Sequence, residues 1–157
     1  MIETKKNFLH KDELEPFNKL LLDNNFAWYY RPDSETGVKD GPYFIHTFFR
    51  DGSVNSEYFS LLEPVLFKIK LKNLIHARAN LYLKKDKQVK SGFHIDFPNM
   101  KTTIVYLNTN NGYTEFEDKT KIKSINNSAV TFNSNLKHRA VYHTDKDYRL
   151  ILNINYE

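Results

Sequence analysis

The sequence of 157 residues contains no cysteine. This absence excludes disulfide-stabilised folds, thiol nucleophiles and zinc sites built on cysteine. A bound metal ion would therefore have to be held by histidine, aspartate and glutamate side chains. Proline and glycine are also scarce, with five of each, and no segment has the low-complexity composition of a linker.

Long apolar runs are missing as well. No stretch approaches the about 18 consecutive apolar residues that a transmembrane helix requires. The first ten residues, MIETKKNFLH, lack the apolar segment of a secretory signal peptide. We therefore expect a cytoplasmic protein with no membrane partner. Oligomeric state leaves no signature in the sequence.

Charge of one sign is not abundant either. The formal net charge is +4, and the excess of basic side chains falls in residues 81–157. Such an excess is compatible with an anionic ligand, but a dedicated nucleic-acid binder carries a much denser basic face. With 40% apolar and 27% charged residues, the composition is that of an ordinary globular protein, and the length suits one domain.

The first half of the chain shows helical periodicity in two places. In residues 11–22, four apolar side chains recur at helical spacing and form one stripe, namely Leu14, Phe17, Leu20 and Leu21. A second helical region covers residues 55–72, where Pro64 is expected to start a new helix. The segment at residues 31–42 is rich in turn-forming residues and is expected to be a loop.

The second half changes to short apolar or alternating runs, such as TTIVYLN at 102–108 and YRLILNINY at 148–156. Many short strands at close spacing predict an antiparallel sandwich or barrel. We therefore expect one structural domain in which residues 1–73 form a helical and loop extension. This extension would pack on a β core formed by residues 74–157.

A His-x-Asp pair, His94 and Asp96, lies in the predicted strand FHIDF. Side chains two positions apart on a strand point to the same face, so the imidazole and the carboxylate would share one space. The pattern alone is weak, because a second such pair, His143 and Asp145, occurs elsewhere. That second pair lies in the polar segment HTDKDY, which we interpret as a solvated turn.

Two later features strengthen the first pair. His138 enters a predicted strand, and Arg149 opens the last one, where it shares a face with Asn153 and Asn155. An arginine and two asparagines on one side of an otherwise apolar strand require a polar or anionic partner. Two histidines and one aspartate also match the facial triad of non-haem Fe(II) oxygenases, which leaves coordination positions open.

The order of His94, Asp96, His138 and Arg149 resembles that of the Fe(II)- and 2-oxoglutarate-dependent dioxygenases, especially their prolyl-hydroxylase-like branch. The resemblance extends over residues 74–157 and is also carried by NLYLKK, IVYLN, NNGYTEF and AVTFNSNLKH. It implies a mainly β fold, the double-stranded β-helix or jelly roll, here with an N-terminal helical layer (α+β).

The resemblance also implies roles for individual residues. The Fe(II) ligands would be His94, Asp96 and His138. Arg149 would bind the distal carboxylate of 2-oxoglutarate with its planar pair of donors. Tyr82 and Tyr106 match tyrosines that contact the cosubstrate, and Asn80 would line the same pocket because it shares a face with Tyr82. The carboxylate of Asp96 favours hydroxylation over halogenation.

The implied activity is hydroxylation of a C–H bond, in which 2-oxoglutarate and O₂ are consumed and succinate and CO₂ are formed, with ascorbate as a candidate reductant. A protein side chain such as proline is the leading substrate candidate, and nucleic-acid bases and small metabolites are the alternatives. The competing interpretation is a non-catalytic, cupin-like module. Such a module would bind a metal or a ligand without forming succinate.

Several features have two interpretations. The loop that carries Lys84, Lys85, Lys87 and Lys90 is either solvated or a rim that attracts an acidic substrate. Residues 31–42 are either a plain loop or a substrate lid. Arg78 shares a face with Asn80 and Tyr82 and could contact a substrate, but a structural role is the favoured interpretation. His46 and His76 are expected to be structural.

Overall fold

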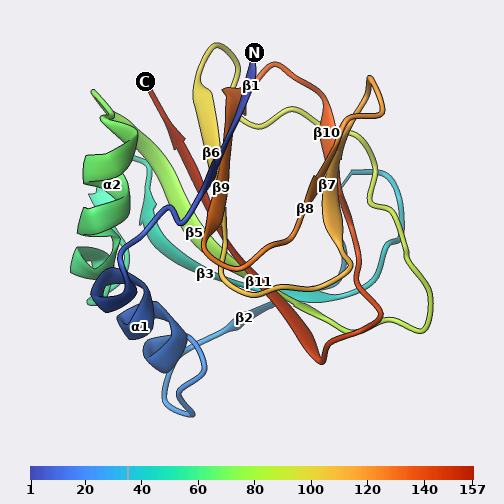
Figure 1. Ribbon diagram of the computed structural model, residues 1–157, viewed down its shortest axis with the longest axis horizontal. Coiled ribbons are helices and arrows are strands. Elements are labelled where there is room, and N and C mark those ends of the chain that lie inside the picture. Colours follow the sequence, from blue (N-terminus) through green and yellow to red (C-terminus); the bar gives the residue numbers. More distant parts are fainter. Residues whose placement is uncertain (35) are drawn as a thin grey trace.

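The computed structural model describes residues 1–34 and 36–157, which form two antiparallel sheets facing each other (Figure 1). The larger sheet contains, in spatial order, β1 (Ile2–Lys6), β9 (Ser128–Asn133), β6 (Lys101–Tyr106), β11 (Tyr148–Tyr156), β5 (Leu74–Leu83), β3 (Tyr43–Arg50) and β2 (Tyr29–Arg31). A short strand, β4 (Ser53–Val54), pairs with β3.

The smaller sheet lies opposite the larger one and contains β10 (His138–Val141), β7 (Tyr113–Phe116) and β8 (Lys121–Lys123). Two isolated bridges, Lys90 to Val141 and His94 to His138, place the chain segment before Asp96 alongside β10. Two opposed antiparallel sheets with this connectivity form a jelly roll. The mainly β fold expected from the sequence is therefore present.

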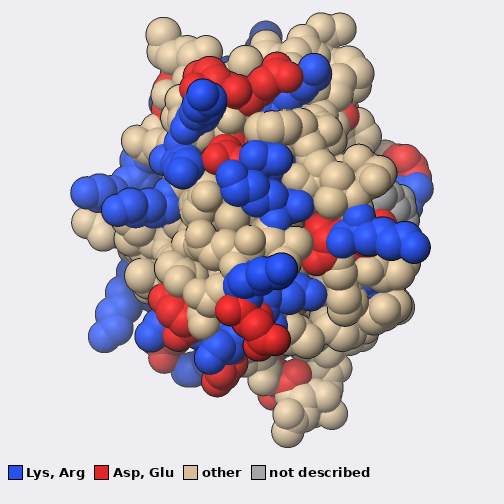
Figure 2. Space-filling view, turned by 90° about the vertical axis from the view of Figure 1, so that its right-hand side faces the viewer, with Lys and Arg blue, Asp and Glu red and all other residues tan. Residues whose placement is uncertain are grey.

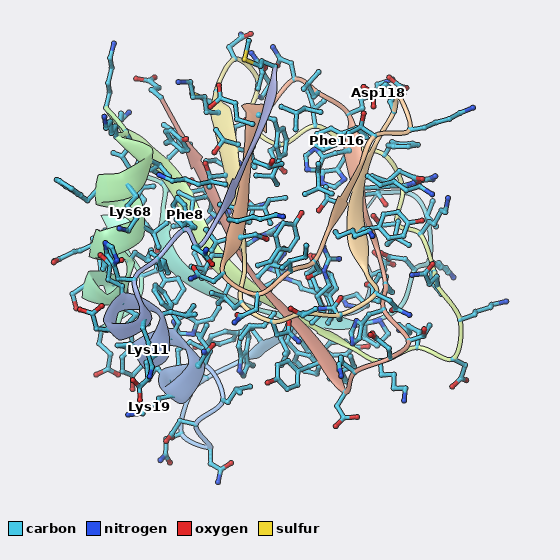
Figure 3. All side chains as sticks on the ribbon, in the orientation of Figure 1. Phe8, Lys11, Lys19, Lys68, Phe116 and Asp118 are labelled. Atoms are coloured by element: carbon cyan, nitrogen blue, oxygen red, sulfur yellow. The ribbon has the colours of Figure 1, made fainter. Side chains whose placement is uncertain are left out.

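Helices cover the outer face of the larger sheet (Figure 1). They are α1 (Lys11–Leu20), the 3₁₀ turn η1 (Phe59–Leu62) and α2 (Glu63–Ile69). Pro64 lies in the first turn of α2, as predicted. Lys68 of α2 contacts Glu13 of α1 at 3.1 Å and joins the two helices (Figure 3). None of the helices in the described residues is long and apolar enough to span a membrane.

The first half of the chain also contributes strands, which the sequence analysis did not anticipate. β1 pairs with β9, and β3 pairs with β5, so one sheet runs across the division at residue 73. The interpretation of residues 1–73 as helix and loop alone was wrong for these segments. β3 escapes detection because it is buried on both faces over most of its length, and this removes the alternation by which strands are found.

The larger sheet separates two cores. Toward the helices, β11 presents Leu150, Leu152 and Ile154, which pack with Phe17 and Leu21 of the α1 region. Toward the smaller sheet it presents Ile151, within a tyrosine-rich core that includes Tyr82, Tyr106, Phe116 and Tyr142. Phe116 on β7 lies between the two sheets (Figure 3). The predicted alternation of the last strand is therefore correct.

The outer face of the smaller sheet carries charges of both signs (Figure 2). Glu115 on β7 is 5% exposed and forms ion pairs with Arg139 (2.6 Å) and Lys90 (3.2 Å). Lys121 lies 4.0 Å from the same carboxylate. Basic side chains on this face are therefore partly neutralised, and they form no continuous basic surface there.

Candidate metal centre and the two adjoining cavities

The structure brings His138 together with His94 and Asp96, which lie much earlier in the sequence. The backbones of His94 and His138 exchange two hydrogen bonds of 3.0 and 2.9 Å across the smaller sheet, so their rings lie 4.6 Å apart. Asp96 follows two residues after His94, and its oxygens lie 3.7 and 3.8 Å from the two Nε2 atoms. All three candidate ligand atoms lie within 4.8 Å of one another.

Backbone carbonyl groups orient both imidazoles. Nδ1 of His138 lies 3.0 Å from the carbonyl oxygen of Leu136, and Nδ1 of His94 lies 3.3 Å from that of Gly92. A proton held on Nδ1 by a carbonyl leaves Nε2 with a free lone pair, which is the usual arrangement of a metal-binding histidine. Both Nε2 atoms therefore face Asp96 as potential ligands.

Two neutral side chains hold the carboxylate of Asp96 in place. Its Oδ2 accepts hydrogen bonds from Thr102 Oγ1 (2.9 Å) and Asn155 Nδ2 (3.1 Å). Burial acts to raise the pKa of Asp96, but the neighbouring His138 and His94 and these hydrogen bonds outweigh it and lower the pKa. Asp96 therefore stays ionised. The polar face of the last strand predicted a polar contact for Asn155, whereas nothing in the sequence indicated one for Thr102.

The donor set fits a first-row divalent metal such as Fe(II). Burial lowers the pKa of His138 despite the nearby Asp96, so its imidazole is neutral and able to bind a cation. The side chains of His138 and Asp96 are 4% and 9% exposed, whereas that of His94 is 34% exposed. Two imidazoles and one carboxylate on one side of an ion leave the other side open, here toward the cavities.

A small inner pocket of about 60 Å³ lies between the sheets, with His94 and His138 at one end and Arg149 in its wall. Arg149 is 1% exposed, and its contacts are long: 3.4 Å to the Val141 carbonyl and 3.5 Å to Thr114 Oγ1. Its Nε has no hydrogen-bond partner among the residues that the structure describes. The guanidinium also contacts the Tyr82 and Tyr106 rings at 5.4 and 5.8 Å, and such a buried, weakly hydrogen-bonded cation favours an anionic partner.

Tyr82, Asn80 and Tyr106 all lie beside Arg149, but in different positions. Tyr82 pairs with Arg149 in the sheet register and, like Asn80, lines the pocket; Asn80 donates a 3.0 Å hydrogen bond to the Tyr82 hydroxyl. Tyr106 is fully buried behind the wall, and its hydroxyl bonds to Thr114 Oγ1 at 2.8 Å. Burial raises the pKa of Tyr106, so this hydroxyl stays protonated.

A larger outer cleft of about 520 Å³ opens on the other side of the triad. His94 and Asp96 stand in its wall, so the candidate metal centre lies between the cleft and the inner pocket. His76 also lines the cleft, although the sequence analysis expected a purely structural histidine. Burial, together with the nearby Arg78, lowers the pKa of His76 to about 4, so this imidazole is uncharged at neutral pH.

One interpretation made from the sequence needs correction, and the structure favours one of the two interpretations of the lysine loop. His143 was assigned to a solvated turn, but its side chain is fully buried. Asp145, two residues later, is exposed as expected and accepts a 2.9 Å hydrogen bond from the Asn111 amide. The chain leaves the core only after His143. The polar residues that follow His143 in the sequence hide this boundary. The lysines at 84, 85, 87 and 90 line neither cavity, so they do not form the substrate rim considered above.

The loop at residues 31–42 borders both cavities through Ser34. Thr36 Oγ1 accepts a 2.8 Å hydrogen bond from the Gly92 amide and thereby joins this loop to the segment that carries His94. Glu35 of the same loop lies outside the described residues. His46 is a structural histidine as expected, with contacts of 2.7 Å to the Ala27 carbonyl and 2.8 Å to Ser56 Oγ.

Neither the protein-family models nor the curated proteins contain a match to this sequence. The solved structures do. A 2OG-Fe(II) oxygenase family protein from Burkholderia pseudomallei superposes with a TM-score of 0.71 at 8% identity, covering 99% of this chain and 84% of the other. The chain has the fold of the 2OG-Fe(II) oxygenases.

Two other solved structures share this oxygenase fold but come from different kinds of enzyme. A Trichoplax adhaerens prolyl hydroxylase, in complex with a peptide from hypoxia inducible factor, has a TM-score of 0.67 at 16% identity and covers 99% of this chain and 83% of its own. The alpha-ketoglutarate-dependent carbocyclase SnoK from nogalamycin biosynthesis has a TM-score of 0.72 at 11% identity, with 99% and 78% covered. The same fold therefore occurs in a hydroxylase bound to a peptide and in a carbocyclase of nogalamycin biosynthesis.

Proposed function

We propose that the protein is an Fe(II)- and 2-oxoglutarate-dependent dioxygenase that hydroxylates a C–H bond of its substrate. One observation carries this proposal: the His94, Asp96 and His138 cluster lies between a small pocket whose wall contains a poorly satisfied arginine and a larger cleft. Such an enzyme needs this arrangement, because cosubstrate and substrate must approach one metal ion from different sides.

His94, Asp96 and His138 would hold the metal, and Arg149 would bind the distal carboxylate of 2-oxoglutarate through two parallel hydrogen bonds. Tyr82 and Asn80 would contact the cosubstrate in the same pocket, and Tyr106 would act through Thr114 on the position of Arg149. When bound, Fe(II) with 2-oxoglutarate and O₂ supplies the oxidising chemistry that yields succinate, CO₂ and the hydroxylated product, with ascorbate as a candidate reductant.

The protein itself contributes positioning and exclusion of water. The inner pocket is lined by the two core sheets, and its ion-pairing group, Arg149, is 1% exposed. A carboxylate bound there would interact strongly, because the local dielectric is low. Asp96 stays ionised through its hydrogen bonds to Thr102 and Asn155, so the ligand set keeps one negative charge for a divalent cation.

A peptide side chain, with proline as the first candidate, remains our proposed substrate, by analogy with the Trichoplax prolyl hydroxylase. Small metabolites are the second candidate, favoured by the likeness to SnoK. We also propose the cytoplasm as the location, because a reducing compartment preserves ferrous iron.

The decisive experiment needs no knowledge of the substrate. Fe(II) and 2-oxoglutarate are added to metal-free protein under nitrogen, and the visible spectrum is recorded. We expect a weak charge-transfer band, from chelation of the iron by the keto acid, that decays when O₂ is admitted while succinate forms. The matched controls are Asp96→Ala, which should lose the band, and Asp51→Ala, which should keep it.

A folded protein that binds Fe(II) but gives neither the band nor succinate would contradict the proposal. That outcome would favour the non-catalytic, cupin-like module. A band without any succinate after O₂ is admitted would also contradict it, because the cosubstrate would then bind without turnover.

A further inference from the structure

The basic side chains of the protein are distributed unevenly between arginine and lysine. The 23 basic residues comprise five arginines and 18 lysines. Three of the five arginines, Arg31, Arg50 and Arg78, line the outer cleft, whereas no lysine does. A planar guanidinium binds a carboxylate or a phosphate with two parallel hydrogen bonds, which an ammonium group cannot do. The cleft therefore has the side chains that recognise an oxyanion.

The three arginines lie on one wall because of the sheet register. Arg78 on β5 is the cross-strand partner of Asn153 on β11, and His76 on β5 is the partner of both Asn155 on β11 and Arg50 on β3. Arg31 ends β2 at the edge of the same sheet. Asn155 bonds to Asp96 at 3.1 Å, so this wall directly adjoins the candidate metal centre.

The charge of these arginines is poorly neutralised within the protein. Arg78 forms no ion pair with any of the described residues, and its buried Nε has no hydrogen-bond partner. Arg50 pairs only with the adjacent Asp51 at 3.0 Å, and both of these side chains are largely exposed to water. A half-buried guanidinium without a partner costs free energy, and an incoming anion would recover this cost.

Two carboxylates, Asp51 and Asp96, also line the cleft, and apolar and uncharged groups complete it. Phe97 is 39% exposed and packs on His76 with ring centroids 5.7 Å apart, and Leu74 and Ile75 line the same space. His76 is neutral, so it adds no charge of its own. A ligand that fits this lining has an oxyanion next to an apolar part.

Arg78 lines both the outer cleft and the inner pocket, whereas Arg149 lines only the inner pocket. In the register of β5 and β11, Arg149 pairs with Tyr82, four residues along the strand from Arg78. At about 3.3 Å per residue, this places the two backbone positions roughly 13 Å apart. Because, of these two cavities, Arg31 and Arg50 line only the cleft, Arg78 can join them in binding an anion that enters from the cleft.

We propose that the outer cleft selects a substrate that carries a carboxylate or phosphate group, which Arg78 binds with support from Arg31 and Arg50. This inference rests on the proposed function only in calling the ligand a substrate. Binding of the anion itself requires neither iron nor 2-oxoglutarate.

The test therefore uses metal-free protein. Phenylacetate, phenyl phosphate and neutral phenylacetamide are titrated while the Nε–Hε signals of the arginines are followed by NMR. We expect saturable binding of the two anions, at least tenfold tighter than that of the amide, with the largest shift at Arg78. The peptide acetyl-Ala-Glu-Phe-Ala-amide and its Gln counterpart distinguish an acidic side chain from a free acid as the source of the anion.

Variants assign the binding to the cleft. Arg78→Gln should weaken anion binding at least tenfold, and Arg50→Gln, at an exposed position that does not threaten the fold, should weaken it severalfold. Lys123→Met removes the same charge from the exposed strand β8 and should change nothing. Equal binding of the anions and the amide, or equal losses in Arg78→Gln and Lys123→Met, would overturn the proposal.

A titration with 2-oxoglutarate separates this proposal from the proposed function. If Arg78→Gln weakened 2-oxoglutarate binding as much as phenylacetate binding, Arg78 would serve the cosubstrate and the inference would fail, although the oxygenase proposal would stand. If the anions bind at Arg78 but the iron and 2-oxoglutarate experiment gives no band, the cleft remains an anion site and only the proposed function fails.

Discussion

The two faces of the larger sheet receive different kinds of side chain from the same strand, β11. Toward the helices, β11 contributes Leu150, Leu152 and Ile154 to an almost wholly apolar core. Toward the smaller sheet, it contributes Arg149, Asn153 and Asn155, which are also buried but carry polar groups. The first side gains free energy by excluding water, whereas the second retains unsatisfied groups such as Arg149 Nε and Asn153 Oδ1. One face is therefore purely stabilising, whereas the other combines an apolar core with the polar groups that we propose bind ligands.

The largest effect is expected on the apolar side. Leu152→Ala, at a fully buried position, should lower the free energy of unfolding by about 3 to 5 kcal/mol through lost burial and the cavity left behind. Urea unfolding of the metal-free protein measures this loss. Fe(II) affinity of the folded variant should remain within about threefold, since the side chain points away from the site. A comparable loss of metal affinity and stability would break the division between the two faces.

Arg149→Leu should have the opposite effect to Leu152→Ala, because it should weaken ligand binding without lowering stability. Loss of two charge-assisted hydrogen bonds should weaken 2-oxoglutarate binding by roughly 100-fold, or about 2.7 kcal/mol. The unfolding free energy of the ligand-free variant should not fall, because a poorly satisfied buried charge has been replaced by an apolar side chain. Calorimetric titration with 2-oxoglutarate and urea unfolding give the two values. Unchanged cosubstrate affinity would mean that another group binds the carboxylate.

Thr102→Val tests the support of Asp96 with a change of almost no volume. The variant removes the 2.9 Å hydrogen bond to Asp96 Oδ2, and Fe(II) affinity should fall about 10-fold, as is typical for groups that orient a metal ligand. Thr103→Val is the matched control, because Thr103 bonds instead to Thr131 and Tyr156. Equal metal affinities in the two variants would show that Asp96 needs no such support.

The smallest effect concerns the pH dependence of stability. The pKa of His76 is about 4 in the folded protein and about 6.5 when unfolded, so the unfolded chain binds the extra proton between these values. Stability should therefore decrease as the pH falls from 6.5 to 4. After discounting for partial solvent exposure, we expect this residue to account for about 1 kcal/mol.

His76→Gln removes this contribution. The variant should therefore show a flatter decline of the unfolding free energy than the wild type over the same interval, measured by urea unfolding at each pH. Burial also lowers the pKa of His46 and His143, so a residual slope is expected in both proteins. Parallel slopes would show that His76 is protonated equally in the folded and unfolded chains.

Much of the fold and of the candidate site could be predicted from the sequence where the relevant pattern is local. The helical stripe around Phe17, the start of α2 at Pro64 and the two faces of the last strand each depend on residues a few positions apart. The order of His94, Asp96, His138 and Arg149 was informative for a different reason: those residue types carry chemistry wherever the strands bring them together.

Only the tertiary structure decided the remaining features. β3 shows no alternation because neighbours cover both of its faces, and His143 is buried although a polar turn follows it. The cluster of Arg31, Arg50 and Arg78 depends on pairing between β2, β3 and β5, and Thr102 reaches Asp96 because the chain turns back between them at residues 97–100. Strand periodicity is a property of each segment alone, whereas register and burial arise from contacts between segments distant in the chain.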